Sequence, residues 1–163
     1  MLGTRRQDRL DTVNGRFAAA NDKSIYTHDK PGSTAPTDTP VVRKTAAPKR
    51  ILLIEDHIDA VRSLAFLLED MGHDVDYAIN GYAGIEKALQ FRPDFILLDL
   101  GLPGIDGFEV CKRLKKEPVL QRARIIAVTA WSQDEHRVRS KAAGCELHLV
   151  KPVPVRLLED LLG

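Results

Sequence analysis

The sequence predicts an α/β fold in which a five-stranded parallel sheet carries helices on both faces, as a three-layer sandwich. From residue 50 to the end of the chain, short apolar runs alternate with segments in which apolar residues recur every three or four positions. This alternation of strand and helix patterns is typical of parallel strands joined by crossover helices. One run, residues 95–98, is wholly apolar, as expected for a strand that is buried on both faces.

The predicted strands are short and rich in aliphatic residues, and they cover residues 50–54, 74–79, 94–98, 124–128 and 146–150. The second strand alternates Val75, Tyr77 and Ile79 with other residues, a period of two that indicates one partly exposed face. Pro93 separates the third strand from the helix before it.

The predicted helices have apolar residues on one side, and they cover residues 59–71, the segment from Asn80 to just before Pro93, and residues 106–116, 132–144 and 153–162. Polar side chains mark three of the starts. Asn80 is a single N-cap, whereas Asp106 and Ser132 are each followed three residues later by Glu and form capping boxes. Gly72 follows the first helix as a C-terminal cap.

Residues 1–48 are predicted to be a flexible, disordered basic leader, and residues 49–163 the folded domain. The stretch 29–48 is rich in Pro, Thr, Ala and Ser, and it has too few apolar residues to offset the entropy of ordering. Residues 1–49 hold nine Lys or Arg against five Asp, whereas the rest of the chain is mildly acidic. A weak helix over residues 5–20 and nucleic-acid binding are alternatives, but the scattered charges favour a solvated tail.

The composition excludes several classes of protein. The formal net charge is +1, and no apolar run approaches the roughly 20 residues that a membrane-spanning helix needs. The basic N-terminus is not followed by the apolar segment of a secretory signal, so we expect a cytoplasmic protein without a membrane partner. Cys111 and Cys145 match neither a metal-binding spacing nor a disulfide framework, which predicts two half-buried free thiols.

Polar residues follow four of the predicted strands at the point where each strand ends. Glu55 and Asp56 follow the first strand, Asp99 the third, Thr129 the fourth and Lys151 the fifth. In a flavodoxin-like sheet with strand order 2-1-3-4-5 these four strands are neighbours, so the residues converge on one pocket at the carboxyl edge. We therefore expect Asp99 to be the functional centre.

The residue types of this pocket predict phosphoryl transfer. Three carboxylates close together repel one another unless a cation neutralises them. Oxygen ligands select a hard ion, and Mg²⁺ (or Mn²⁺) takes one or two carboxylates while keeping several waters. A metal ion and the ammonium of Lys151 would together stabilise a phosphoryl group that arrives on Asp99.

At these residues the chain resembles a known family. Residues 50–162 are similar to the receiver domain of two-component response regulators: the acidic pair, Asp99 within LLDLGLPGIDG, Thr129 and Lys151-Pro152 have the family's order and spacing. The segments DLGLPGIDGFEV and HLVKPV are closest in wording to receivers attached to hybrid histidine kinases. Because the chain stops with its last predicted helix, we expect a stand-alone, single-domain receiver.

The resemblance implies a role for each acidic residue of the pocket. Asp99 would accept phosphate from a phosphohistidine. Asp56 and Asp99, with the backbone carbonyl of Gly101, would bind Mg²⁺, and Glu55 would act mainly through a bound water.

The resemblance also implies roles for the residues after the last two strands. Thr129 would turn its hydroxyl to one phosphoryl oxygen, and Lys151 would pair with another. The peptide bond between Lys151 and Pro152 is expected to be cis, and Ala130 is small because the phosphoryl group must be approached closely.

Three positions, His148, Trp131 and Gly101, depart from the family's common pattern. His148 lies where many receivers carry Tyr or Phe as a rotating switch, so we expect a weaker or hydrogen-bonded switch, or else a surface-facing polar residue near a partner site. Trp131 is expected at the mouth of the pocket, where it shields the acyl phosphate, docks a partner or packs as a lid. His57 is expected to be a helix-start residue near solvent, and Gly101 replaces larger side chains.

The predicted function is that of a phosphoacceptor response regulator. A histidine kinase or histidine phosphotransfer protein would donate the phosphoryl group to Asp99, and the signal would pass to a downstream protein target by protein contact. An alternative is a phosphorelay intermediate or phosphate sink that returns the group to a histidine phosphotransfer protein. No enzymatic activity is expected beyond self-catalysed phosphotransfer and slow autodephosphorylation.

Three rival functions are disfavoured by particular residues. A phosphatase with an Asp nucleophile usually has a second Asp two residues later, where this chain has Gly101. A nucleotide-binding module would carry a phosphate-binding loop after the first strand, where this chain has Glu55 and Asp56. A DNA-binding regulator would need a helix-turn-helix, which no segment supplies, so no nucleic-acid partner is expected.

Overall fold

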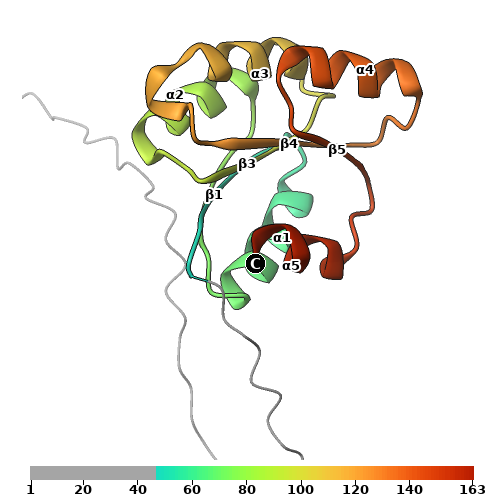
Figure 1. Ribbon diagram of the computed structural model, residues 1–163. Helices are drawn as coiled ribbons and strands as arrows, with labels where there is room; N and C mark the ends of the chain where they lie inside the picture. Colours follow the sequence, from blue (N-terminus) through green and yellow to red (C-terminus); the bar gives the residue numbers. More distant parts are fainter. Residues whose placement is uncertain (1–46) are drawn as a thin grey trace, which may run out of the picture. The chain divides into compact units, whose positions relative to one another are not determined.

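The computed structural model describes residues 47–163, which form a five-stranded parallel sheet in the order β2-β1-β3-β4-β5 (Figure 1). The strands are β1 (Arg50–Ile54), β2 (Asp74–Ala78), β3 (Phe95–Leu98), β4 (Arg124–Thr129) and β5 (Leu147–Val150). The predicted α/β fold and strand order are therefore confirmed. The predicted leader over residues 1–48 lies almost wholly outside the described residues, so its flexibility stays a prediction.

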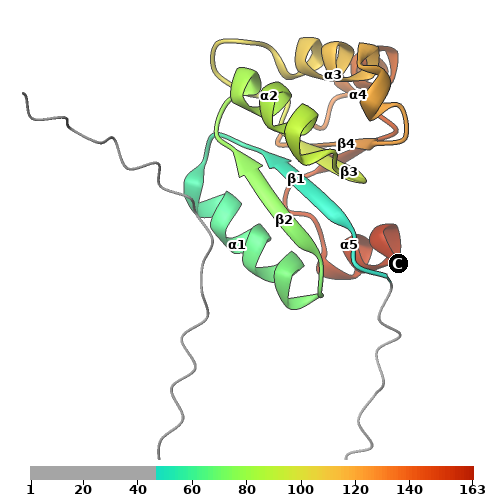
Figure 2. The same cartoon turned by 90° about the vertical axis from the view of Figure 1, so that its left-hand side faces the viewer.

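The helices cover the sheet from both sides, with α1 and α5 on one face and α2, α3 and α4 on the other (Figures 1 and 2). They are α1 (Ile58–Asp70), α2 (Gly81–Phe91), α3 (Gly107–Lys116), α4 (Asp134–Ala143) and α5 (Val155–Leu162), with a short 3₁₀ helix, Pro118–Leu120, after α3. None of the helices between residues 47 and 163 is long and apolar enough to cross a membrane.

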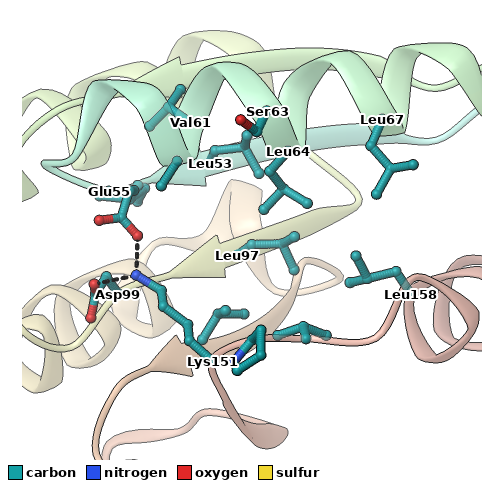
Figure 3. A pocket seen from close by; sticks show the side chains of 15 residues that line it. Leu53, Glu55, Val61, Ser63, Leu64, Leu67, Leu97, Asp99, Lys151 and Leu158 are labelled. Atoms are coloured by element: carbon teal, nitrogen blue, oxygen red, sulfur yellow. Dashed lines mark hydrogen bonds and ion pairs between the residues drawn. The ribbon is translucent and has the colours of Figure 1, made fainter.

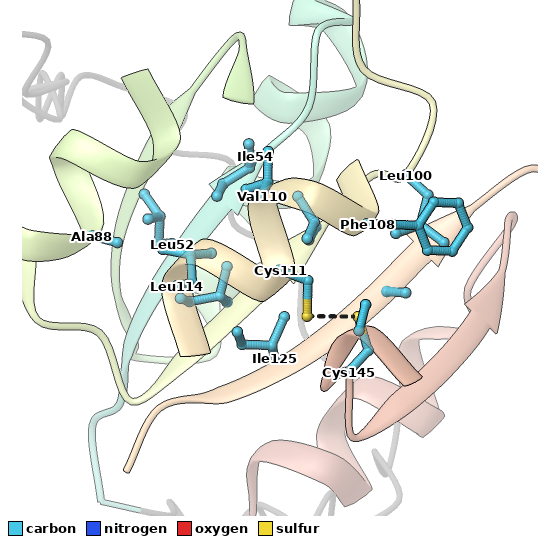
Figure 4. Packing of buried hydrophobic residues seen from close by; sticks show 14 of the residues in the cluster. Leu52, Ile54, Ala88, Leu100, Phe108, Val110, Cys111, Leu114, Ile125 and Cys145 are labelled. Atoms are coloured by element: carbon cyan, nitrogen blue, oxygen red, sulfur yellow. Dashed lines mark hydrogen bonds between the residues drawn. The ribbon is translucent and has the colours of Figure 1, made fainter. Parts of the chain in front are cut away.

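The central strands β1, β3 and β4 contribute to two hydrophobic cores, because successive side chains point to opposite faces of the sheet. In β1, Leu52 and Ile54 pack into the core beneath α2, α3 and α4, which Figure 4 shows. Ile51 and Leu53 pack instead into the core beneath α1 and α5. Burial on both faces explains why the residues of these three strands are almost uniformly apolar.

The predicted helix caps are confirmed at Asn80 and wrong at Ser132. The side chain of Asn80 accepts a hydrogen bond from the N–H of Ala83 at 2.9 Å. By contrast, α4 begins two residues after Ser132, with Gln133 at the N-cap and no side-chain cap. Asp134 and Glu135 lie in its first turn instead, where their charges favour the helix N-terminus.

The capping box at Asp106 is half formed. Asp106 Oδ1 accepts from the N–H of Phe108 at 2.9 Å, which caps the helix as predicted. Glu109 does not return to Asp106, because its carboxylate accepts a hydrogen bond from Arg113 Nε one turn later at 2.9 Å. The reciprocal half of the predicted box is therefore wrong.

The two cysteines are free, as predicted, but they are not half-buried. Cys111 and Cys145 are 0% and 5% exposed, and their sulfur atoms are 3.1 Å apart (Figure 4). Cys111 lies on α3 and Cys145 follows α4, so the packing of these two helices brings the thiols together. The prediction failed because contact across the fold cannot be read from sequence spacing.

Candidate functional site

The carboxyl ends of β1 and β3 and the segment after β5 meet at one edge of the sheet and bring Glu55, Asp99 and Lys151 together (Figure 3). Glu55 and Asp99 are only 9% and 8% exposed, and Thr129 at the end of β4 is 1% exposed. The parallel register fixes this arrangement, since Ile54 pairs with Leu98 and Leu98 with Ala127.

Both carboxylate oxygens of Asp99 are engaged. Oδ2 accepts a hydrogen bond from Lys151 Nζ at 2.7 Å, and Oδ1 accepts one from the N–H of Gly101 at 2.9 Å. The backbone N–H of Asp99 donates to the carbonyl of Ile54 at 2.9 Å. The acidic side chain is thus held at a fixed position with two hydrogen-bond donors aimed at its oxygens.

Lys151 bridges the two buried carboxylates, since its ammonium also contacts Glu55 Oε2. Burial by itself lowers the pKa of Lys151, but hydrogen bonds to Asp99 and Glu55, together with their negative charges, raise that pKa above its ordinary value. The side chain is therefore cationic at neutral pH. Its charge offsets the repulsion between the two carboxylates.

Asp56 lies at the same edge but turns toward His57. Nδ1 of His57 is 3.0 Å from Asp56 Oδ1 and 3.1 Å from Glu55 Oε1. The hydrogen bond with Glu55, followed by the charges of Asp56 and Glu55, raises the pKa of His57. Within residues 47–163, no hydrogen bond or ion pair joins Asp56 to Asp99.

The solvent-exposed position predicted for His57 is confirmed, but its side chain does more than begin α1. Its ring nitrogen and one oxygen each from Glu55 and Asp56 lie within 4.8 Å of one another. The predicted metal ligands Glu55 and Asp56 are therefore adjacent, and a histidine that the sequence did not single out as a ligand lies between them.

A crevice of about 410 Å³ extends from these charged groups between α1 and α5 (Figure 3). Glu55, Asp99 and Lys151 lie at one end of it. The remaining walls are mostly aliphatic side chains from α1, α5 and the sheet, among them Val61, Leu64, Leu67, Leu97 and Leu158. A nucleophilic carboxylate beside a cation in a crevice with mostly aliphatic walls is suited to forming a covalent bond with an electrophilic group.

Thr129 and Lys151 are tied together through the backbone, since the N–H of Lys151 donates to the Thr129 carbonyl at 2.9 Å. Thr129 Oγ accepts a hydrogen bond from the N–H of Trp131 at 3.4 Å. Ala130 between them is exposed, and the Lys151-Pro152 peptide bond is cis, as predicted.

Trp131 does not line the crevice. Its ring stacks on His136 of α4 at 4.5 Å between centroids and on Phe108 of α3 at 6.1 Å. Among the three predicted roles of Trp131, this placement favours packing. Arg139 completes the cluster, with its guanidinium 4.1 Å from the ring centroid of Phe108.

His148 is half-buried and hydrogen-bonded on both ring nitrogens, so the prediction of a surface-facing side chain is not supported. Nε2 is 2.8 Å from the Trp131 carbonyl, and Nδ1 is 3.0 Å from the hydroxyl of Ser140, a buried residue of α4. Ser140 could not be identified from the sequence, because a serine within a polar helix carries no pattern that distinguishes it.

Two glycines near Asp99 have opposite steric surroundings. A Cβ atom on Gly101 would lie 3.5 Å from Asp99 Oδ1, which is ordinary contact. A Cβ atom on Gly107 would lie 2.5 Å from Leu100 Cα and 2.6 Å from the Asp99 carbonyl oxygen. Gly107, which no sequence pattern marks as part of the site, thus allows α3 to begin directly against the backbone of Asp99.

Comparison with known proteins agrees with this geometry. The family model of the response regulator receiver domain matches residues 51–162. The polar-differentiation response regulator DivK of Brucella anthropi is 36% identical over 117 residues, which are 70% of this chain and 94% of that protein. The transcriptional regulatory protein AfsQ1 of Streptomyces coelicolor is 43% identical over 110 residues, which are 67% of this chain. This chain spans about half of that regulator, 47% of its length.

Solved structures show the same arrangement of elements. The receiver domain of the sensor histidine kinase PA1611 from Pseudomonas aeruginosa, described with a magnesium ion coordinated in the active site cleft, has a TM-score of 0.66 and 29% identity. The match covers 71% of this chain and 95% of that one. A CheY-like receiver domain protein from Methanospirillum hungatei has a TM-score of 0.65 and 30% identity, and the match covers 71% and 91% of the two chains.

Proposed function

This chain belongs to the response regulator receiver domain family, a family of signalling domains, and on that premise we propose that Asp99 accepts a phosphoryl group from a phosphohistidine. The observation that carries the proposal is the placement of Asp99 at the end of β3, 8% exposed, with Lys151 Nζ at 2.7 Å. Residues 49–163 form the receiver domain in this proposal, and residues 1–48 a leader.

In the proposed step, a carboxylate oxygen of Asp99 attacks the phosphorus of the donor. An O–P bond forms while the N–P bond of the phosphohistidine breaks, and the electron pair of that bond returns to the donor's imidazole. Lys151 pairs with one phosphoryl oxygen, and the hydroxyl of Thr129 donates to another. Most of the rate enhancement comes from positioning and charge stabilisation, as is usual in phosphoryl transfer.

The residues at the sheet edge fit a hard divalent cation, because Glu55, Asp56 and Asp99 supply carboxylate oxygens. We propose that Asp56, Asp99 and the carbonyl of Gly101 hold Mg²⁺ (or Mn²⁺), with Glu55 acting mainly through a bound water. When bound, the ion neutralises the carboxylates and the charge of the incoming phosphoryl group. The similar PA1611 receiver domain, described with magnesium in its cleft, supports this assignment.

The proposed donor is a histidine kinase or a histidine phosphotransfer protein. The phosphorylated chain then engages a downstream protein through the face around β4 and β5. A phosphorelay intermediate is the alternative, and a mixture with a phosphotransfer protein separates the two. Rapid movement of the phosphoryl group from Asp99 to that protein would favour the relay, and retention on Asp99 would favour an effector.

The test is incubation with Mg²⁺ and acetyl phosphate, followed by intact-mass measurement. The wild-type chain should gain one phosphoryl group, and Asp99→Ala should gain none. Asp59→Ala removes an exposed carboxylate of α1 and is the matched control, which should gain mass like wild type. A mass gain that survives in Asp99→Ala would overturn the proposal, as would no gain in wild type with either acetyl phosphate or a phosphorylated kinase.

A further inference from the structure

We propose that Ser140 and His148 form a hydrogen-bonded strut that positions Trp131 and, through it, the hydroxyl of Thr129. This inference rests on the proposed phosphoacceptor function and deepens it. Ser140 and His148 are positioning residues here, because neither is in contact with Asp99 and both act through the backbone of the β4–α4 segment.

The strut joins three elements of the fold. Nε2 of His148 on β5 lies 2.8 Å from the carbonyl oxygen of Trp131, which follows β4. Nδ1 of the same ring lies 3.0 Å from Ser140 Oγ on α4. A half-buried imidazole that is engaged on both nitrogens has one preferred orientation, because rotation about its side chain would break both hydrogen bonds at once.

The contact with Trp131 assigns one proton of the ring. A carbonyl oxygen only accepts, so Nε2 of His148 carries a hydrogen and donates it to Trp131. The Ser140 hydroxyl has one hydrogen, which donates either to the carbonyl of Arg137 at 2.9 Å or to Nδ1. In the first case Nδ1–H donates to Ser140 Oγ, so the contact between the two side chains is kept in both. Ser140 is 1% exposed, so no bulk water replaces it as a partner for His148.

Trp131 is consequently fixed at both ends of its backbone. Its carbonyl is held by His148, and its N–H donates to Thr129 Oγ at 3.4 Å. Since the oxygen of Thr129 accepts from Trp131, its hydroxyl hydrogen is directed elsewhere and remains free to donate. The position of the Trp131 backbone therefore sets the direction in which Thr129 offers its hydrogen.

Helix α4 supports the strut at two further points. The guanidinium of Arg137 donates to the carbonyl of His148 at 3.2 Å, and the ring of His136 stacks on Trp131 at 4.5 Å. Together with Ser140, these contacts tie the orientation of one helix to the segment that carries Thr129. In this chain the coupling between the site and α4 thus uses hydrogen bonds rather than the rotation of a free aromatic ring.

The test uses Ser140→Ala, which removes the hydroxyl, and His148→Phe, which keeps a planar ring without nitrogen atoms. Each should slow the phosphorylation of Asp99 by acetyl phosphate and Mg²⁺ about fivefold, the change that the loss of one hydrogen bond worth about 1 kcal/mol produces. The double variant should be no slower than the slower single variant, because both break the same network. His148→Gln, which retains an N–H donor for the Trp131 carbonyl, should recover part of the rate.

Two further measurements separate positioning from a general loss of structure. In a Thr129→Val background, Ser140→Ala should cause no further fall in rate if the strut acts through the Thr129 hydroxyl. Trp131 is the single tryptophan of the chain, so its emission spectrum reports the strut directly. That spectrum should shift in Ser140→Ala and His148→Phe, and it should stay unchanged in Ser132→Ala, a matched change at an exposed serine.

If Ser140→Ala and His148→Phe have the same phosphorylation rate and the same emission spectrum as wild type, the strut is overturned while the proposed function stays intact. An equal fall in rate in the Thr129→Val background would overturn its action through Thr129. If wild type accepts no phosphoryl group, the proposed function fails instead, and an unshifted Trp131 spectrum in the two variants would then refute the strut on its own.

Discussion

Replacing Gly107 with alanine should destabilise the fold at the point where it supports Asp99. The added Cβ would lie 2.5 Å from Leu100 Cα and 2.6 Å from the Asp99 carbonyl oxygen. Both are backbone atoms, so they cannot move aside as the end of a flexible side chain can. Either α3 or the end of β3 must shift.

The magnitude follows from two opposing effects. Overpacking of a close-packed site typically costs about 1–3 kcal/mol. Alanine in place of glycine at a helical position recovers at most about 1 kcal/mol, and less at the first position of α3. We therefore expect Gly107→Ala to lower the free energy of unfolding by about 1–2 kcal/mol. In a domain of this size, the melting temperature should fall by roughly 4–10 °C.

Gly101→Ala is the matched control, because it is the same substitution in the same loop. Its Cβ would make only an ordinary 3.5 Å contact with Asp99 Oδ1, and the residue is exposed. Its effect on unfolding in urea should stay within about 0.5 kcal/mol. Gly107→Ala should also slow phosphorylation of Asp99. The steric reasoning is refuted if Gly107→Ala is as stable as wild type, or if Gly101→Ala is equally destabilising.

Substitutions at three other positions have definite expected outcomes. Burial, and then the charge of Lys49, lowers the pKa of His73, so the unfolded state binds more protons and stability is lost as pH falls. The free energy of unfolding in urea should be measured at about pH 7.5 and about pH 5.5, on either side of the ordinary histidine pKa of about 6.5. It should fall between these two pH values in wild type, and it should fall less in His73→Phe. Cys145→Ala should cost about 1 kcal/mol in urea unfolding, and Cys145→Ser more, because a hydroxyl enters an apolar cluster; equal costs would contradict this. Lys151→Met should slow phosphorylation of Asp99 on the order of a hundredfold in stopped-flow assays, and an unchanged rate would exclude its role in charge stabilisation.

The fold was predictable because the three central strands, β1, β3 and β4, are buried on both faces. Ile51 and Ile54 face different cores, and yet both must be apolar, so the run stands out in the sequence. The cap at Asn80 was predictable for a local reason, since its partner Ala83 lies three residues away. The predicted ends of the helices and strands lie within two residues of the observed ends.

The predicted cap at Ser132 and the predicted half-burial of the cysteines were wrong, because both depend on side-chain packing between elements that are distant in sequence. Ser132 has the local pattern of an N-cap, but α4 begins two residues later, at Asp134. The preceding residue, Trp131, is held in place by a hydrogen bond to His148 and by stacking on His136 of α4. Cys111 and Cys145 are 34 residues apart in sequence, and only the packing of α3 against the turn after α4 brings them into contact.

For the candidate site, one topological rule carried the prediction. Residues that follow neighbouring parallel strands lie at the same edge, and this rule placed Glu55, Asp99 and Lys151 together before any distance was known. The rule says nothing about residues that reach the edge from a helix. Ser140 and Gly107 are two such residues. The backbone around Gly107 leaves no space for a Cβ atom, and the hydroxyl of Ser140 is hydrogen-bonded to His148, but no sequence pattern indicates either fact.

The two faces of the sheet therefore contribute differently to the site. On the side of α3 and α4, Gly107 contacts the backbone of Asp99, and Ser140 supports the segment that carries Thr129. On the side of α1 and α5, aliphatic side chains line a crevice that leaves Lys151 room beside Asp99. Substitutions beneath α3 and α4 should alter how the reacting groups are held, whereas substitutions of Leu64 or Leu67 should alter what enters the crevice. Phosphorylation rates measured with acetyl phosphate in both kinds of variant test this expectation, and equal changes in both would contradict it.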